Sequence, residues 1–144
     1  MLKTKIAVFV SGGGTNFEAL INAQENGKIP HGEIVLMVSS SKTAYALKRA
    51  ENHGIKSVVC SKKELGSQES FEEEILKNLE ENDIQLIVLA GFMSILSKEF
   101  TKKYENRIIN IHPSLIPSFC GEGFYGLHVH EAALKKGVKV TGAT

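Results

Sequence analysis

Hydrophobic residues form short, nearly continuous runs near the start of the chain. KIAVFV at 5–10 and EIVLMV at 33–38 are typical of strands that are buried on both faces of a parallel sheet. Four later runs are interpreted as strands as well, at 56–60, 85–90, 107–111 and 138–144.

Helical patterns separate these runs. Phe71, Ile75 and Leu79 recur at four-residue steps, while Glu72 lies off that stripe. The pattern predicts helices at 16–26, 44–53, 68–82, 97–104 and 128–136, and glycines stand where left-handed C-caps would follow three of them, at Gly27, Gly54 and Gly137.

The alternation of strands and helices with short connections predicts an α/β fold. We expect one domain over residues 1–144 with a doubly wound, mostly parallel, Rossmann-like sheet and helices on both faces. Ligands of such sheets bind at the carboxyl ends of the strands. No helix follows the run at 138–144, so the domain is expected to be incomplete at its C-terminal end.

Composition narrows the functional classes. With 144 residues, 42% of them hydrophobic, the chain suffices for one buried core but not for two. A net charge of +1 argues against a nucleic-acid partner, and apolar runs of strand length predict a cytoplasmic protein that does not enter a membrane. Cys60 and Cys120 lack the spacing of a zinc site, so no metal and two reduced thiols are expected.

A glycine-rich loop joins the first strand to the first helix. In SGGGTN, at 11–16, glycines let backbone N–H groups approach an anion and the helix N-terminus adds partial positive charge. Phe17 replaces the third glycine of a dinucleotide motif and no Gly-Lys-Ser/Thr follows, so a monophosphate is favoured over NAD or ATP. The alternative is a tight turn with Thr15 or Asn16 as N-cap.

Two polar residues end the apolar run at 107–111. In IINIHPSLIPSF, Asn110 and His112 are two residues apart and would project to the same side of a strand that Pro113 terminates. An amide and an imidazole suit acyl transfer, because they stabilise an oxyanion and move a proton. Without a Ser or Cys nucleophile motif, direct transfer is favoured. The alternative is that both residues merely cap the following loop.

Together these motifs resemble one known family. NIHPSLIPSF (110–119) is similar to the Asn-x-His-Pro-Ser-Leu-x-Pro signature of the folate-dependent formyltransferases. SGGGTN resembles the phosphate loop of the branch that formylates glycinamide ribonucleotide, and LAGFMSILS (89–97) resembles its folate-lining segment. VKVTGAT (138–144) resembles the strand that leads to its last catalytic residue, and the similarity runs from residue 5 to residue 144.

The resemblance implies a reaction in de novo purine biosynthesis. A formyl group would pass from 10-formyltetrahydrofolate to the amine of glycinamide ribonucleotide, directly through a tetrahedral intermediate and without a metal. Asn110 and His112 would be the catalytic residues, and the phosphate would bind to Gly13, Gly14, Thr15 and Asn16. The folate-binding residues would be Phe92, Met93, Ser94, Ile95, Leu96 and Asn110.

Departures from the family pattern keep alternatives open. Some members carry Arg where Gln68 and Ser94 stand here, and the family's catalytic Asp is expected beyond Thr144. Methionyl-tRNA formyltransferases lack the SGGGTN loop, and formyltetrahydrofolate hydrolases add an N-terminal domain that this chain is expected not to have. A non-catalytic sugar-phosphate-binding remnant remains the alternative from another class. Pairing through an uncovered sheet edge leaves a homodimer open.

Overall fold

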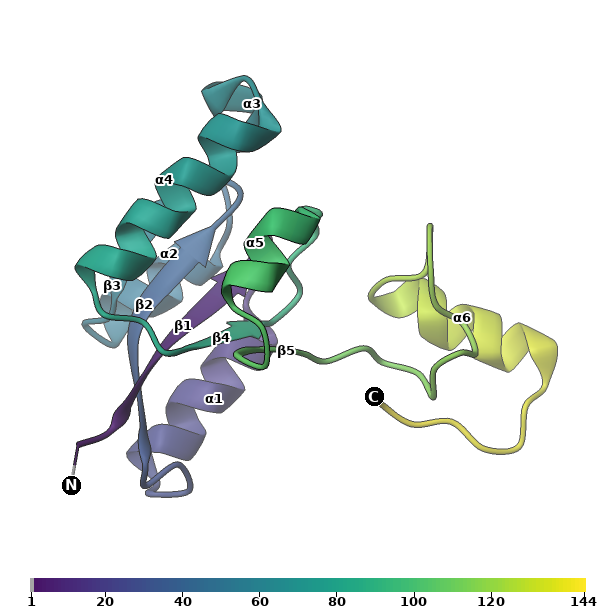
Figure 1. The fold of residues 1–144 in the computed structure, drawn as a ribbon. Coiled ribbons are helices and arrows are strands. Elements are labelled where there is room, and N and C mark those ends of the chain that lie inside the picture. Colours follow the sequence, from purple (N-terminus) through teal and green to yellow (C-terminus); the bar gives the residue numbers. More distant parts are fainter. Residues whose placement is uncertain (1) are drawn as a thin grey trace. The chain divides into compact units, whose positions relative to one another are not determined.

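The computed structural model describes residues 2–144, which form two compact units that divide after Ile109. Strands and helices alternate in the first unit, and the second, Asn110–Thr144, contains one helix (Figure 1). The strands are β1 Thr4–Val10, β2 Gly32–Ser39, β3 Lys56–Val59, β4 Leu86–Leu89 and β5 Ile108–Asn110. The helices are α1 Thr15–Glu25, α2 Ala46–Asn52, α3 Lys62–Leu65, α4 Gln68–Glu81, α5 Lys98–Lys103 and α6 Leu127–Lys136. Among the described residues, no helix is long and apolar enough to cross a membrane.

The sheet has five strands in the order β3-β2-β1-β4-β5. β1 lies at its centre and runs parallel to both neighbours, with Val8 opposite Met37 on β2 and Val88 on β4. After β3 the chain returns to place β4 on the other side of β1, so the strand order reverses between β1 and β4. Because ligands of open α/β sheets bind at such a switch point, the loops that follow β1 and β4 are the first place to look for a site. The predicted doubly wound fold is confirmed.

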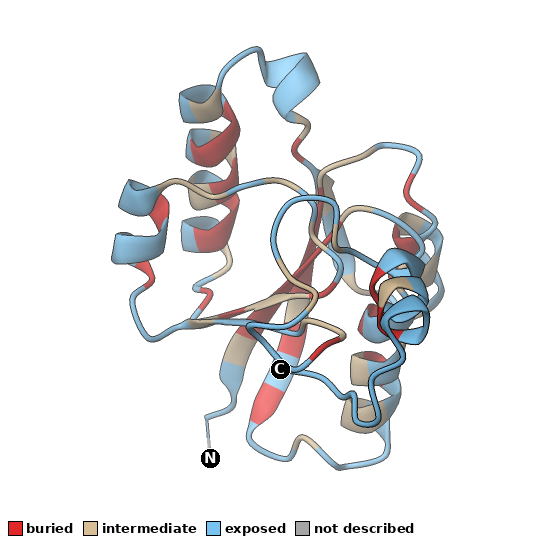
Figure 2. Cartoon of the chain, turned by 90° about the vertical axis from the view of Figure 1, so that its right-hand side faces the viewer, coloured by how far each residue is buried: buried red, intermediate tan, exposed pale blue. Residues whose placement is uncertain are grey.

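Apolar side chains cover both faces of this sheet. Figure 2 colours the buried residues of the strands and of the helices red. Phe71, Ile75 and Leu79 on α4 are fully buried against one face, as their four-residue spacing predicts. On the opposite face, Phe17 of α1 and Ala46 of α2 are equally buried. Burial of these stripes, at about 25 cal/mol per Å² of apolar surface, fixes both helix layers on the sheet.

Glycine determines where the first helix begins. Gly14 is the N-cap of α1 in a left-handed conformation, with φ of 71° and no side-chain cap. The alternative interpretation of the loop, with Thr15 or Asn16 as N-cap, is therefore wrong in that detail. A glycine reaches this conformation without the penalty that a Cβ imposes, and its carbonyl accepts from the Glu18 N–H at 2.9 Å. The left-handed glycines predicted at three helix ends are confirmed, with φ of 70°, 66° and 72° at Gly27, Gly54 and Gly137. Gly137 is the C-cap of α6, whereas Gly27 and Gly54 stand one residue after the C-caps of α1 and α2.

Two local predictions differ from the structure. Residues 138–144 do not form a strand. Val138 bonds back to Ala133 of α6 at 3.4 Å, and Thr144 exchanges N–H···O bonds of 2.7 and 2.9 Å with His112, which is one pair and not a ladder. Such a reciprocal exchange has the antiparallel pattern. Helix α3 was not predicted, because four residues are too few to show a helical period.

Candidate functional site

The loop after β1 is fastened to helix α2. The Ala46 N–H donates to the Gly12 carbonyl at 3.2 Å, and Arg49 Nε donates to the Gly13 carbonyl at 2.8 Å. A Cβ on Gly14 would lie 2.7 Å from the Cβ of Ala46, closer than such atoms pack. Gly14 is therefore required by the loop's own structure.

Gly12 and Gly13 have no such requirement. Neither has a positive φ, and a Cβ added to either would meet no atom within 4 Å. Both are exposed, as are Thr15 and Asn16 at the start of α1, where the first N–H groups of a helix lack intrahelical partners. A tight turn explains Gly14 but leaves Gly12 and Gly13 unexplained, whereas close approach of an anion to the backbone accounts for them.

Ser11 joins this loop to the segment that follows β4. Its N–H donates to the Gly91 carbonyl at 3.1 Å, and its Oγ accepts from the Met93 N–H at 2.8 Å. The same Oγ lies 2.6 Å from Ser40 Oγ at the end of β2. Sequence reasoning did not assign Ser11 a role, although its place directly after the central strand was a usable signal.

Side chains of the predicted folate-lining segment differ in their surroundings. Phe92 packs edge-on against Phe9, with ring centroids 5.2 Å apart, so its side chain belongs to the core. Met93 and Ile95 are 55% and 85% exposed. Ser94 and Leu96 alone among the five segment residues line the cavity beside β4. The other predicted folate-binding residue, Asn110, belongs to the second unit.

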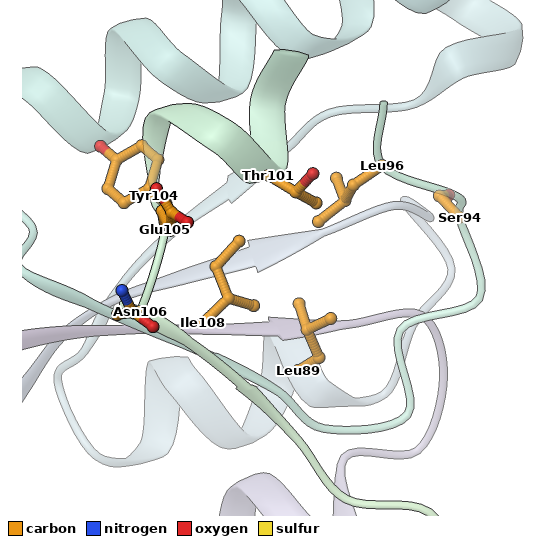
Figure 3. Close-up of a pocket in the computed structure, with 8 residues that line it drawn as sticks. All are labelled: Leu89, Ser94, Leu96, Thr101, Tyr104, Glu105, Asn106 and Ile108. Carbon is orange, nitrogen blue, oxygen red and sulfur yellow. The ribbon is translucent and has the colours of Figure 1, made fainter. Parts of the chain in front are cut away.

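That cavity has a volume of about 460 Å³, within the usual range of small-molecule sites of about 300–1,000 Å³. Leu89 of β4 and Ile108 of β5 point into it toward Leu96 and Thr101 (Figure 3). Its lining residues are Leu89, Ser94, Leu96, Thr101, Tyr104, Glu105, Asn106 and Ile108. Sequence reasoning missed Thr101, Tyr104 and Glu105, although their spacing places them together on one face of a helical turn.

A network of charged side chains between α1 and α2 is hydrogen-bonded to the glycine loop. Arg49 Nη1 donates to Glu18 Oε2 at 3.2 Å, while His53 lies 3.0 Å from Glu18 and 2.9 Å from Glu25. Hydrogen bonds from His53 and Arg49 hold the pKa of Glu18 below its ordinary value, and those to Glu25 and Glu18 raise the pKa of His53. The network ends at the Gly13 carbonyl, through Arg49 Nε.

The second unit carries Asn110 and His112. Asn110 is exposed at the end of β5, and its side chain makes no hydrogen bond within residues 2–144. His112 is half-buried and lies beyond the strand, with Nε2 2.9 Å from the Phe119 carbonyl oxygen. The predicted strand 107–111 thus ends one residue early, and the two side chains are not joined by a hydrogen bond in the described chain.

Hydrogen bonds fold the signature loop onto itself. Ser114 is 1% exposed, and its Oγ donates to the Ser118 carbonyl at 2.5 Å. Thr144 Oγ1 donates to the Ser114 carbonyl at 2.8 Å and accepts from the Ile116 N–H at 3.0 Å. Ser114 and Thr144 therefore hold this loop closed. Of the two residues for which loop capping was the alternative, His112 also bonds the loop, through the Phe119 carbonyl.

Of the four sequence motifs, those at 11–16 and 89–97 meet in the first unit, and those at 110–119 and 138–144 lie in the second unit. Ser11 connects the glycine loop, which contains Gly13, Gly14, Thr15 and Asn16, to the segment that contains Phe92 to Leu96. Across residues 2–144, no group of three or more His, Cys, Asp or Glu side chains could hold a metal ion. Cys60 and Cys120 are both free.

Comparisons with known proteins agree on one family. The family model described as formyl transferase matches residues 4–144. The trifunctional purine biosynthetic protein adenosine-3 of Gallus gallus is 46% identical over 142 residues, which are 99% of this chain and 14% of that protein. The chloroplastic phosphoribosylglycinamide formyltransferase of Arabidopsis thaliana is 34% identical, over 99% of this chain and 49% of its own length.

Solved structures give the same result. A phosphoribosylglycinamide formyltransferase from Brucella melitensis is 42% identical with a TM-score of 0.88, over 99% of this chain and 71% of that chain. The chain thus spans less than half of the two curated relatives named above and about 70% of this solved structure.

Proposed function

Because this chain belongs to the formyl transferase family, we propose that it transfers a formyl group from 10-formyltetrahydrofolate to the amine of glycinamide ribonucleotide. It is a homologue of proteins named for this reaction in purine biosynthesis. The proposed partners are these two small molecules, and the proposed location is the cytoplasm.

One observation carries the proposal: Ser11 joins the glycine loop to the segment beside the 460 Å³ cavity. The loop offers backbone N–H groups at exposed glycines, which suit a phosphate. The cavity offers apolar walls with Thr101, Glu105 and Asn106 as polar groups, which suits a flat heterocycle with polar edges. A phosphate site and a ring site joined by one residue at the switch point fit a reaction between a ribonucleotide and a folate.

Asn110 and His112 are the proposed reacting groups. When the amine nitrogen attacks the formyl carbon, a C–N bond forms and the carbonyl oxygen becomes negative. The Asn110 amide would donate to that oxygen, and His112 would move the proton that the amine loses. The tetrahedral intermediate collapses as the bond from carbon to the folate nitrogen breaks, and that nitrogen takes up the proton. No covalent enzyme intermediate is needed.

Calorimetric titration of the protein with each substrate in turn tests the proposal. Gly13→Ala puts a methyl group into open space, so it leaves the fold intact but occupies the room that a phosphate needs. Loss of hydrogen bonds to a charged group, at about 1.5–3 kcal/mol each, predicts a Kd for glycinamide ribonucleotide that is roughly 10–100 times higher. The Kd for 10-formyltetrahydrofolate should stay unchanged.

Gly27→Ala is the control for a general loss of stability: Gly27 lies at the other end of α1 with a φ of 70°, so an added methyl group strains the backbone there and should lower the Tm without changing the Kd for the ribonucleotide. Equal ribonucleotide affinity in wild type and Gly13→Ala would contradict the phosphate site. Binding of the ribonucleotide without any folate binding would favour the non-catalytic remnant.

A further inference from the structure

A carboxylate of helix α4 is buried beneath the cavity wall. Glu72 is 8% exposed, and its Oε1 accepts from the Ser97 N–H at 2.5 Å while its Oε2 accepts from Ser97 Oγ at 2.6 Å. Gln68 Nε2, one turn earlier on α4, donates to Oε1 at 2.7 Å. All three groups donate, which matches an acceptor-only carboxylate.

Gln68 extends this contact to the segment itself. The same Nε2 donates to the Ile95 carbonyl at 3.0 Å, between the cavity-lining residues Ser94 and Leu96. Gln68 and Glu72 therefore hold the segment at two places, Ile95 and Ser97.

Ser97, which is held by Glu72, also fixes the start of helix α5. It is the N-cap of α5, and its Oγ accepts from the Phe100 N–H at 3.1 Å. Helix α5 and the residues directly after it supply Thr101, Tyr104 and Glu105 to the cavity. A shift of Ser97 would thus move both the segment and the helix that line this site.

Stability alone does not account for Glu72. No ion pair reaches it within residues 2–144, and a buried carboxylate without a cationic partner is costly to desolvate. The neighbouring buried positions of α4, Phe71 and Ile75, are apolar, so burial on this helix does not itself call for a carboxylate. An apolar residue could not orient the three groups that donate to Glu72, which are the Ser97 N–H, the Ser97 hydroxyl and the Gln68 amide.

We propose that Glu72, together with Gln68, positions the wall of the folate site and thereby sets the affinity for the formyl donor. The identity of the ligand rests on the proposed function, whereas the positioning of the wall rests on the hydrogen bonds above. Glu72 touches neither substrate. It acts through Ser97, and Gln68 acts through the Ile95 carbonyl.

Glu72→Gln tests this role with almost no change of shape. An amide nitrogen in place of Oε2 would donate to Ser97 Oγ, so the hydrogen-bond pattern changes direction there and the charge-assisted bonds of the carboxylate become weaker neutral ones, which loosens the wall. The Kd for 10-formyltetrahydrofolate should rise about tenfold or more, while that for glycinamide ribonucleotide stays within about twofold. Hydrogen–deuterium exchange of the amides at 94–101 should become faster.

Glu80→Gln is the matched control. Glu80 also joins α4 to α5, through Lys103 at 2.6 Å, but both side chains of that pair are at least half exposed. It should change neither the folate Kd nor the exchange at 94–101. Ser97→Ala should reproduce Glu72→Gln, whereas Ser97→Thr keeps the hydroxyl and should behave as wild type, so the role can be tested even if the Glu72 variant does not fold.

The possible results separate the two proposals. Suppose that the wild type binds folate and that Glu72→Gln binds it equally well, with unchanged hydrogen–deuterium exchange. The positioning role is then overturned, and the proposed function stands. Wild type that does not bind folate overturns the proposed function instead. In that case, hydrogen–deuterium exchange still tests the positioning of this wall. Faster exchange at 94–101 in Glu72→Gln and Ser97→Ala, but not in Glu80→Gln, supports the positioning role. Unchanged exchange refutes it.

Discussion

His112 Nε2 lies 2.9 Å from the carbonyl oxygen of Phe119. Since a carbonyl oxygen only accepts, this hydrogen bond requires the proton on Nε2 and leaves Nδ1 as the nitrogen available to another partner. The Ser114 hydroxyl lies 3.4 Å from the same oxygen, so the acceptor is itself held in place. If His112 handles protons in the proposed reaction, it does so through Nδ1.

The first prediction concerns this tautomer. When the imidazole ring of His112 is uncharged, its single N–H should be at Nε2, because that is the nitrogen that donates to the Phe119 carbonyl. Long-range ¹H–¹⁵N NMR spectra distinguish the two ring nitrogens directly. A ring protonated at Nδ1, or an even mixture, would contradict the hydrogen bond. His128, which is exposed, is the reference residue.

The second prediction concerns turnover. In protein that catalyses formyl transfer, His112→Ala should lower kcat by about 10²–10⁴ with little change in either Kd, because a proton-transfer group is lost. Asn110→Ala should cost a comparable factor through the oxyanion. Steady-state kinetics and calorimetry measure the two effects, with His128→Ala as the control. Near-normal turnover with only a lower Tm would favour the alternative that both residues cap the loop.

The third prediction separates the two kinds of glycine in the loop. Gly14→Ala should reduce the free energy of unfolding by about 2–4 kcal/mol, because it combines a left-handed backbone with a Cβ 2.7 Å from Ala46 Cβ. Gly13→Ala should stay within about 0.5 kcal/mol of wild type. Chemical denaturation measures both. Equal losses would mean that Gly13 is also required by the fold.

Sequence alone predicted the elements in which pattern and packing agree. The four-residue spacing of Phe71, Ile75 and Leu79 predicts α4 because burial at one face of the sheet selects the same residues. The prediction of a strand at 138–144 was wrong, because a strand exists only where a neighbouring strand supplies a ladder of hydrogen bonds. In this stretch, Thr144 alone pairs with another strand-like residue, His112.

The candidate site was predictable in part for a similar reason. The glycine loop and the segment after β4 are continuous in sequence, so their motifs can be recognised there. The contacts of Ser11 with Met93 and of Glu72 with Ser97 join residues 82 and 25 positions apart. Such contacts arise from the order of strands in the sheet, which no local pattern contains.

The fourth prediction is a pH dependence that comes from the ion network behind the loop. Hydrogen bonds to Glu25 and Glu18 raise the pKa of His53, so its stabilising contribution is complete below its ordinary pKa near 6.5 and is lost as pH rises through the raised value. The lowered pKa of Glu18 has the opposite sign: its contribution is present above about 4.5 and is lost as pH falls further.

Both contributions are therefore present between about pH 4.5 and 6.5. The difference in Tm between wild type and His53→Gln should be largest in that window and should shrink toward pH 9. His31→Gln, at an exposed turn, should give a small difference at every pH. A His53→Gln difference that is constant from pH 5 to pH 9 would show that the imidazole acts by packing rather than by charge.

The fifth prediction concerns the two thiols. Cys60 is 1% exposed, and burial raises its pKa to about 11, so at pH 8 only about one thiol in a thousand is ionised. Cys120 is half-buried on the signature loop. A disulfide reagent at pH 8 should therefore modify Cys120 at once and Cys60 only after denaturant is added. Absorbance of the released thiolate gives the count, and a Cys120→Ser variant identifies the fast site. Rapid reaction of two thiols in native protein would mean that the core cluster around Cys60, which includes the buried side chains of α4, opens far more readily than its burial implies.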